Sequence, residues 1–153
     1  MAQNLREDMT EQSPQGIQNS RGNLQILLYS DDSSVRQSVI TALGKQLDSQ
    51  LPRHEVKEFA TADALRLYVD SKKRVDLFIL DGEAVPEGGM GVARQLKDEV
   101  FNCPPILVIT GRVHDAWLAT WSKAEDWITH PIDPFTLASK CAALLKVDSA
   151  LAK

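Results

Sequence analysis

Polar side chains that could bind a cation or move a proton stand directly after several short apolar runs of this sequence. In chain order they are Ser30, Asp31, Asp32, Asp81, Thr110 and His130. Carboxylate and hydroxyl oxygens are ligands for hard cations, and an imidazole can take up or release a proton near neutral pH. These residue types indicate one site for metal-assisted or acid–base chemistry, provided that the fold brings them together.

The apolar runs have the character of strands that are buried on both faces of a sheet. The strongest runs are Leu24–Tyr29, Val75–Leu80 and Pro105–Ile109, and weaker strands are expected at Glu55–Phe59 and Trp127–Thr129. Segments whose apolar residues recur at helical spacing lie between these runs. This spacing is seen in the stripe Val35, Val39, Leu43 and Leu47, and then over Ala62–Ser71, Gly89–Val100, Val113–Ser122 and Phe135–Val147.

Five strands that alternate with five helices predict an α/β fold, a five-stranded parallel sheet with helices on both faces. In such sheets the functional groups gather at the carboxyl ends of the strands, so the polar residues are expected at one edge. Each of them also has an ordinary structural role open to it. Asp32 could cap the first helix, and Thr110 could be a turn residue.

Composition and charge predict one soluble, cytoplasmic domain. The 153 residues are 43% hydrophobic, and 17 basic and 21 acidic side chains give a net charge of −4. This balance offers no electrostatic case for binding nucleic acid or a membrane surface, and neither membrane insertion nor a signal peptide is expected. Cys103 and Cys141 lack metal-ligand spacing and are expected to be reduced, at least half-buried thiols.

The pattern divides the chain into three parts. Residues 1–23, rich in Gln, Asn, Ser, Glu and Gly, are expected to be a flexible N-terminal tail. Residues 24–147 are expected to form the domain, and residues 148–153 a short C-terminal tail. Since no DNA-binding, zinc or catalytic module follows the domain, output is expected through contact with another protein.

The ordered part of the chain resembles the receiver domain of bacterial response regulators. The resemblance spans about Leu24 to Leu145 and rests on four stretches in the family's order, Asp76–Asp81, Gly89–Lys97, Ile106–Gly111 and Ala124–Pro134. It implies the (βα)5 flavodoxin-like receiver fold. It also implies a phosphoprotein of two-component signalling that is not an enzyme, with a histidine kinase, an effector or a second copy of the chain as partner.

The resemblance assigns roles position by position. Asp81 matches the phosphoacceptor, a carboxylate that attacks a phosphoryl group while Mg²⁺ neutralises charge. Asp31, Asp81 and the backbone carbonyl of Glu83 match the metal ligands. Thr110 matches the switch hydroxyl that hydrogen-bonds a phosphoryl oxygen, and Trp127 matches the aromatic switch residue.

Two positions depart from the family's pattern. When Arg36 is placed on the family's arginine, the acidic metal-binding pair falls on Ser30 and Asp31; the other register places it on Asp31 and Asp32. A serine at the first position weakens Mg²⁺ binding without abolishing it. His130 takes the place of the family's lysine, so a side chain that is mostly neutral at cytoplasmic pH replaces a fixed charge. Alternatively, His130 makes only a local hydrogen bond before Pro131, and the bond between them is a candidate for cis.

The region from the fourth helix to the fifth strand holds all three tryptophans. Trp117 and Trp121 lie one turn apart on the same helical face. They are either core residues against the sheet or an exposed docking face of the kind that anchors interfaces. The segment between Thr110 and Ala124 is slightly short for the family, so the fourth helix is expected to be displaced.

Two functional hypotheses follow. The first is a stand-alone receiver switched by phosphorylation of Asp81, which Asp31, Asp81 and Thr110 favour. The second is a pseudo-receiver adaptor, an accessory subunit that binds a larger protein assembly independently of phosphorylation, which Ser30 and His130 favour. A metal-dependent phosphohydrolase that uses Glu83 as a second acid is a weaker alternative, because no lid is evident. A flavin site is disfavoured, because no phosphate-cradling loop follows the first strand.

Overall fold

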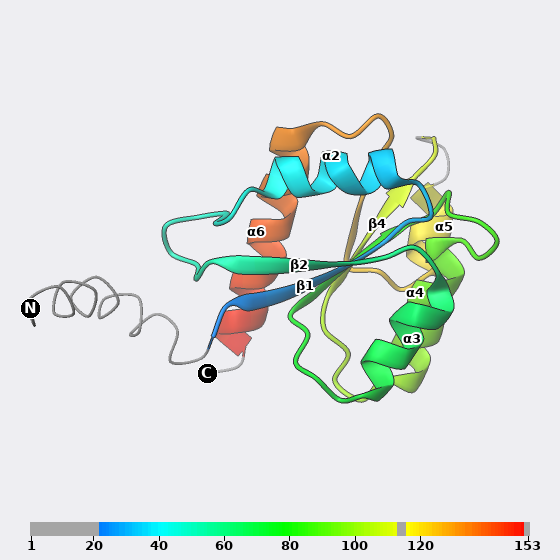
Figure 1. The fold of residues 1–153 in the computed structure, drawn as a ribbon, viewed down its shortest axis with the longest axis horizontal. Coiled ribbons are helices and arrows are strands. Elements are labelled where there is room, and N and C mark those ends of the chain that lie inside the picture. The colour runs from blue at the N-terminus through cyan, green and yellow to red at the C-terminus, as the bar shows by residue number, and fades with distance from the viewer. Residues whose placement is uncertain (1–21, 113–115, 152–153) are drawn as a thin grey trace, which may run out of the picture.

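The computed structural model describes residues 22–112 and 116–151, so most of the predicted N-terminal tail lies outside the described residues. Within these ranges, five strands form one parallel sheet in the order β2-β1-β3-β4-β5 (Figure 1). The strands are β1 (Leu24–Tyr29), β2 (His54–Phe59), β3 (Leu77–Asp81), β4 (Ile106–Thr110) and β5 (Asp126–Thr129). The predicted five-stranded parallel sheet is confirmed.

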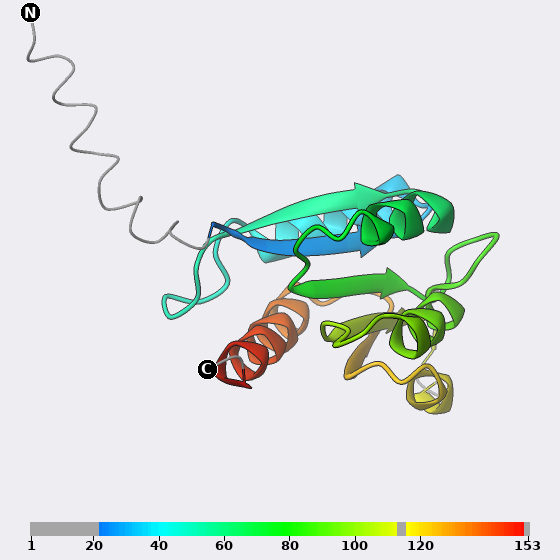
Figure 2. The same cartoon turned by 90° about the horizontal axis from the view of Figure 1, so that it is seen from below.

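Helices cover both faces of the sheet, as Figures 1 and 2 show. They are α2 (Ser33–Leu43), α3 (Ala62–Asp70), α4 (Gly89–Glu99), α5 (Ala116–Trp121) and α6 (Pro134–Leu151). Helices α2 and α6 pack on one face, over Ile26 and Leu28 of β1. Helices α3, α4 and α5 pack on the other face, over Leu27 and Tyr29. Each fully buried Leu or Ile side chain stabilises the fold by about 1.5–3 kcal/mol.

The largest differences from the sequence-based expectation are at the ends of three helices. Helix α2 stops at Leu43 and does not reach Leu47, because Gly44 adopts a left-handed φ of 58° and its N–H bonds to the Ile40 carbonyl. Helix α6 continues past Val147 to Leu151, so the expected C-terminal tail begins as helix; no Gly or Pro stops it. Helix α5 covers only Ala116–Trp121 of the expected 113–122, and residues 113–115 lie outside the described ranges.

The strand order places the predicted site. The chain lays β2 on one side of β1 and β3 on the other, so the order reverses between β1 and β3, where crevices form in open α/β sheets. Tyr29 pairs with Leu80 across this point, which sets Ser30 beside Asp81. The ends of β4 and β5 follow along the same edge, where Thr110 pairs with Thr129. Over the described ranges, every helix is too short or too polar to cross a bilayer.

Candidate functional site

Asp81 is the centre of the polar edge. Its side chain is almost fully buried at the end of β3. Its Oδ2 accepts a hydrogen bond from the Ser30 hydroxyl at 2.7 Å, and its Oδ1 accepts one from the Glu83 backbone N–H at 2.9 Å. The His130 Nε2 lies 3.3 Å from the same Oδ1. A buried carboxylate is costly unless donors compensate it. The Ser30 hydroxyl and the Glu83 N–H do so, and the His130 Nε2 is a third donor in the tautomer that carries a proton on this nitrogen.

The three polar residues after β1 have three different environments. Ser30 is fully buried against Asp81. Asp31 is exposed, and its Oδ1 accepts from the Val85 backbone N–H at 3.1 Å in the loop that follows Asp81. Asp32 caps α2, where bonds from the Ser34 hydroxyl and backbone N–H hold the pKa of Asp32 below its usual range. Ser30 and Asp31 therefore belong to the site and Asp32 to the helix.

Arg36 on α2 fits the same arrangement. Arg36 donates from Nη1 to the Ser30 carbonyl at 2.7 Å and from Nε to Glu58 at 3.0 Å. It therefore fixes the backbone of Ser30 from α2. This geometry agrees with the register in which Ser30 and Asp31 occupy the positions of the acidic pair.

The start of α4 approaches the end of β3 so closely that glycine is required at position 89. A Cβ on Gly89 would lie 2.7 Å from the Asp81 carbonyl oxygen, so another residue there would displace the start of α4. A Cβ on Gly111 would lie 2.5 Å from a Glu83 carboxylate oxygen, a contact that the flexible Glu83 side chain can relieve by moving. The Glu83 side chain thus lies against the end of β4, while its backbone N–H points to Asp81.

Thr110 and Trp127 lie on the neighbouring strands. The buried Thr110 hydroxyl is 3.2 Å from the Ile128 carbonyl oxygen and 3.0 Å from the Thr129 hydroxyl, so it is directed toward β5. Trp127 is exposed, with the Lys140 ammonium 5.6 Å from its ring centroid. The His130 N–H bonds to the Thr110 carbonyl at 2.9 Å, and the peptide before Pro131 is cis, as expected.

Tyr29 and Arg66 were missed by the sequence analysis. The Tyr29 hydroxyl donates to the Glu87 carbonyl at 2.6 Å; burial raises the pKa of Tyr29, and the charges of Glu87 and Asp31 raise it further. Arg66 on α3 donates two hydrogen bonds to the Glu87 carboxylate, at 2.9 and 2.5 Å. Both residues therefore hold the acceptor loop, defined here as residues 82–88. The one signal in the sequence for this contact was Tyr29 itself, a phenol at the end of a mostly apolar strand.

The donors at this edge fit a hydrated Mg²⁺ ion. Across residues 22–112 and 116–151, no three His, Cys, Asp or Glu side chains cluster as a metal site. The carboxylate oxygens available here belong to Asp31 and Asp81, which both accept hydrogen bonds from the acceptor loop. Mg²⁺ keeps several waters and needs only one or two carboxylates, so this reduced set suits a weak site.

The tryptophan pair on α5 lies at the surface. The exposed fraction is 67% for Trp117 and 46% for Trp121. The Arg94 guanidinium lies 5.0 Å from the Trp121 ring centroid and donates to the Trp121 carbonyl at 2.9 Å. Both rings are therefore at the surface and not in the core, and their role as a docking face stays a prediction.

Comparison with curated proteins finds close relatives. Two uncharacterized response regulatory proteins of Mycobacterium tuberculosis, from strains CDC 1551 / Oshkosh and ATCC 25618 / H37Rv, are each 50% identical to this chain over 123 residues. The match covers 80% of this chain and 92% of each relative. No protein-family model matches the chain.

Solved structures share the fold at low sequence identity. The chemotaxis response regulator CheY4 of Vibrio cholerae has a TM-score of 0.65 at 23% identity, over 80% of this chain and 99% of that one. A CheY-like receiver domain protein from Methanospirillum hungatei JF-1 has a TM-score of 0.66 at 19% identity, over 84% and 98%. Such distant matches bear on the fold alone.

Proposed function

Because the chain belongs to the response regulator family and carries its receiver domain, we propose that it is a stand-alone receiver phosphorylated on Asp81. The observation that carries the proposal is the position of Asp81, a buried carboxylate at the reversal of strand order with both oxygens held by donors. Asp31 is bonded to the same loop and supplies a second carboxylate.

The proposed reaction is phosphoryl transfer to a carboxylate. An Asp81 oxygen attacks the phosphorus of a phosphohistidine or a small acyl phosphate, a P–O bond forms, and the leaving group departs with its bonding electrons. Mg²⁺, when held by Asp31, Asp81 and the Glu83 carbonyl, neutralises charge on the phosphoryl oxygens. The Ser30 hydroxyl and the Glu83 N–H orient the carboxylate. We expect the Thr110 hydroxyl to turn from β5 toward a phosphoryl oxygen.

Response regulators act through other proteins and are not usually counted as enzymes, so we infer a kinase and an effector as partners in the cytoplasm. The exposed pair Trp117 and Trp121 is the docking face that we assign to the effector. Aromatic side chains dominate the binding energy of many interfaces, which supports this assignment.

A phosphorylation-independent adaptor is the second candidate function. It is favoured by the donors on Asp81, because Ser30 and His130 bond the two oxygens that a metal ion and a phosphoryl group would need. Under this hypothesis the domain is an accessory subunit of a larger assembly, and Asp81 only stabilises the fold.

The intact mass of the protein after incubation with acetyl phosphate and Mg²⁺ separates the two functions. The matched control is Asp81→Asn, which keeps the size of the side chain but cannot form an acyl phosphate. We expect the mass of one phosphoryl group on the wild type and none on the control. An unmodified wild type, or equal modification of the control, would rule out the switch and favour the adaptor.

A further inference from the structure

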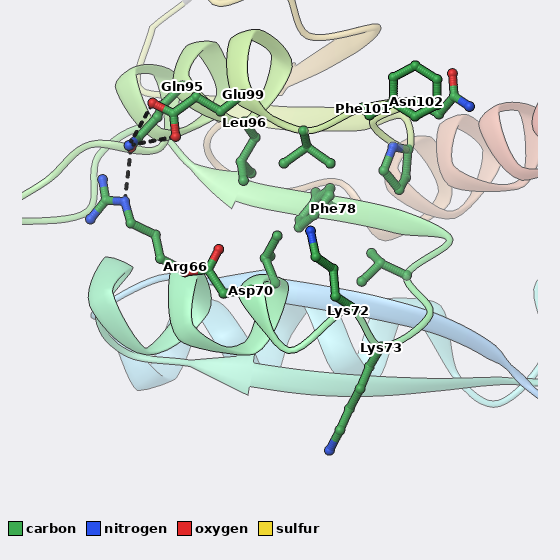
Figure 3. Close-up of a pocket in the computed structure, with 14 residues that line it drawn as sticks. Arg66, Asp70, Lys72, Lys73, Phe78, Gln95, Leu96, Glu99, Phe101 and Asn102 are labelled. Atoms are coloured by element: carbon green, nitrogen blue, oxygen red, sulfur yellow. Dashed lines mark hydrogen bonds between the residues drawn. The ribbon is translucent and has the colours of Figure 1, made fainter.

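A groove of about 730 Å³ lies between α3 and α4, apart from the site around Asp81 (Figure 3). Its floor is apolar and consists of Val69, Val75, Phe78, Leu96 and Val100. Val75 and Pro104, at its open end, precede β3 and β4, so the groove lies toward the amino ends of the strands. At its other end, Arg66 on α3 donates to Gln95 on α4 at 2.9 Å and closes it.

Phe101 stands at the rim of this groove. It follows the end of α4, where Asn102 adopts a left-handed φ of 52° and turns the chain toward β4. Its side chain is 90% exposed, the largest value among the exposed large hydrophobic residues in the described part of the chain. A protruding aromatic beside an apolar groove that it does not fill is unfavourable in a monomer, since water contacts both surfaces.

The two rims carry opposite charges. Asp70, Lys72 and Lys73 stand at the end of α3, so this rim is basic on balance, and Glu99 stands on α4 across the groove. In Figure 3, Lys72 reaches into the groove and Lys73 points away from it. A two-fold rotation would set the basic rim of one copy against the acidic rim of another. A surface that recognises nucleic acid would instead be basic throughout.

We propose that this groove is the interface of a homodimer in which Phe101 of each copy fills the groove of the other. A two-fold interface must be self-complementary, and the patch has both halves of each contact: a protruding ring with an apolar groove, and a basic rim with an acidic one. The dimer uses α3 and α4 and leaves Trp117 and Trp121 free for a different partner. Its formation does not require phosphorylation of Asp81.

The interface reaches the acceptor loop through Arg66. This side chain lines the groove and also holds Glu87, in the loop that follows Asp81. Filling the groove therefore restricts the residue that fixes this loop, and the loop supplies the Glu83 N–H to Asp81.

The oligomeric state across a concentration series, measured by sedimentation velocity, tests the proposal. We expect a reversible dimer for the wild type and at least about 100-fold weaker association for Phe101→Asp, because the change removes a central aromatic anchor. The matched control is Phe135→Asp at the start of α6, which is 83% exposed and distant from the groove. It should dimerise like the wild type.

A charge exchange gives a second readout that a fold defect would not reproduce. Lys72→Glu and Glu99→Lys should each weaken the dimer, and the double variant should restore it, because the pairs form between opposite rims of two copies. Thermal melts check that each variant is folded. A wild type that stays monomeric throughout the series would overturn the proposal, as would equal loss of the dimer in the Phe101 and Phe135 variants.

Discussion

The imidazole of His130 lies 3.3 Å from the Asp81 Oδ1, where the family's lysine would place a fixed positive charge. A lysine is longer and carries three donors, so it can reach both the carboxylate and an incoming phosphoryl group. We predict that His130→Lys speeds phosphorylation of Asp81 by about tenfold or more, a gain of ~1.4 kcal/mol in the transition state. The rate at which the phosphoryl adduct appears by intact mass measures this, with the Asp81→Asn/His130→Lys double variant as control. An unchanged rate would show that the histidine does not limit the chemistry.

Ser30 is the second residue that sets the strength of the site. Its hydroxyl donates to Asp81, whereas an acid there would add a carboxylate and remove a donor. We predict that Ser30→Asp lowers the melting temperature in EDTA, because two buried carboxylates repel each other. Added Mg²⁺ should then raise the melting temperature of the variant more than that of the wild type. Equal responses to Mg²⁺ would count against a metal site between Asp31 and Asp81.

At the scale of elements, His54 joins the start of β2 to the end of α2. Its Nε2 lies 2.7 Å from the Gly44 carbonyl oxygen, so this nitrogen donates. Its Nδ1 is buried without a hydrogen-bond partner. Burial lowers the pKa of His54, because protonation would add a charge and a donor in a place that offers no acceptor.

This environment predicts a loss of stability in mild acid. The unfolded chain takes up a proton at His54 near pH 6.5, above the lowered pKa of the folded state, so stability falls as the pH drops through this window and levels off below the folded pKa. Urea unfolding between about pH 7.5 and pH 5 measures the effect. His54→Gln retains a donor for Gly44 but does not titrate. Its stability should fall less steeply than that of the wild type, and parallel curves would contradict the assignment.

The strands and helices could be predicted from the sequence because buried segments are rich in apolar residues. The strand Leu24–Tyr29 agrees with the structure at both ends. Five of its six residues are apolar or aromatic, which is typical of a strand covered on both faces. Helix ends were less predictable. Helix α2 ends at Leu43 although the apolar stripe continues to Leu47. The positive φ of Gly44 ends the helix, and one further apolar contact at Leu47 is not enough to extend it.

The site was predictable as a set of residue types but not as a set of bonds. The polar residues at the strand ends meet at one edge because parallel strands end together. The Ser30 hydroxyl bonds to Oδ2 of Asp81, whereas Glu83 and His130 both contact Oδ1. This pattern depends on the geometry of loops that are distant in sequence. The Tyr29 contact to Glu87 and the groove beside Phe101 were likewise invisible, because each requires two elements placed in space.

At the scale of the whole molecule, hydrogen bonds between β4 and β5 connect the site around Asp81 to the surface that carries Trp127. The Thr110 hydroxyl bonds to β5 at Ile128 and Thr129, next to Trp127 at the surface. If this hydroxyl turns toward a phosphoryl group on Asp81, β5 loses two contacts. The packing of Trp127 against Lys140 must then adjust, so that a chemical event in the interior changes the exposed face.

Tryptophan fluorescence tests whether this connection works. The chain has three tryptophans, so Trp117→Phe/Trp121→Phe leaves Trp127 as the sole reporter. We predict that acetyl phosphate with Mg²⁺ changes the emission of this variant in step with the mass adduct. Thr110→Val, which has nearly the same shape but no hydroxyl, should still form the adduct while the emission stays constant. An adduct on the reporter variant without any change in emission would mean that phosphorylation does not reach the surface through Thr110, and the domain would then act on its partners irrespective of Asp81.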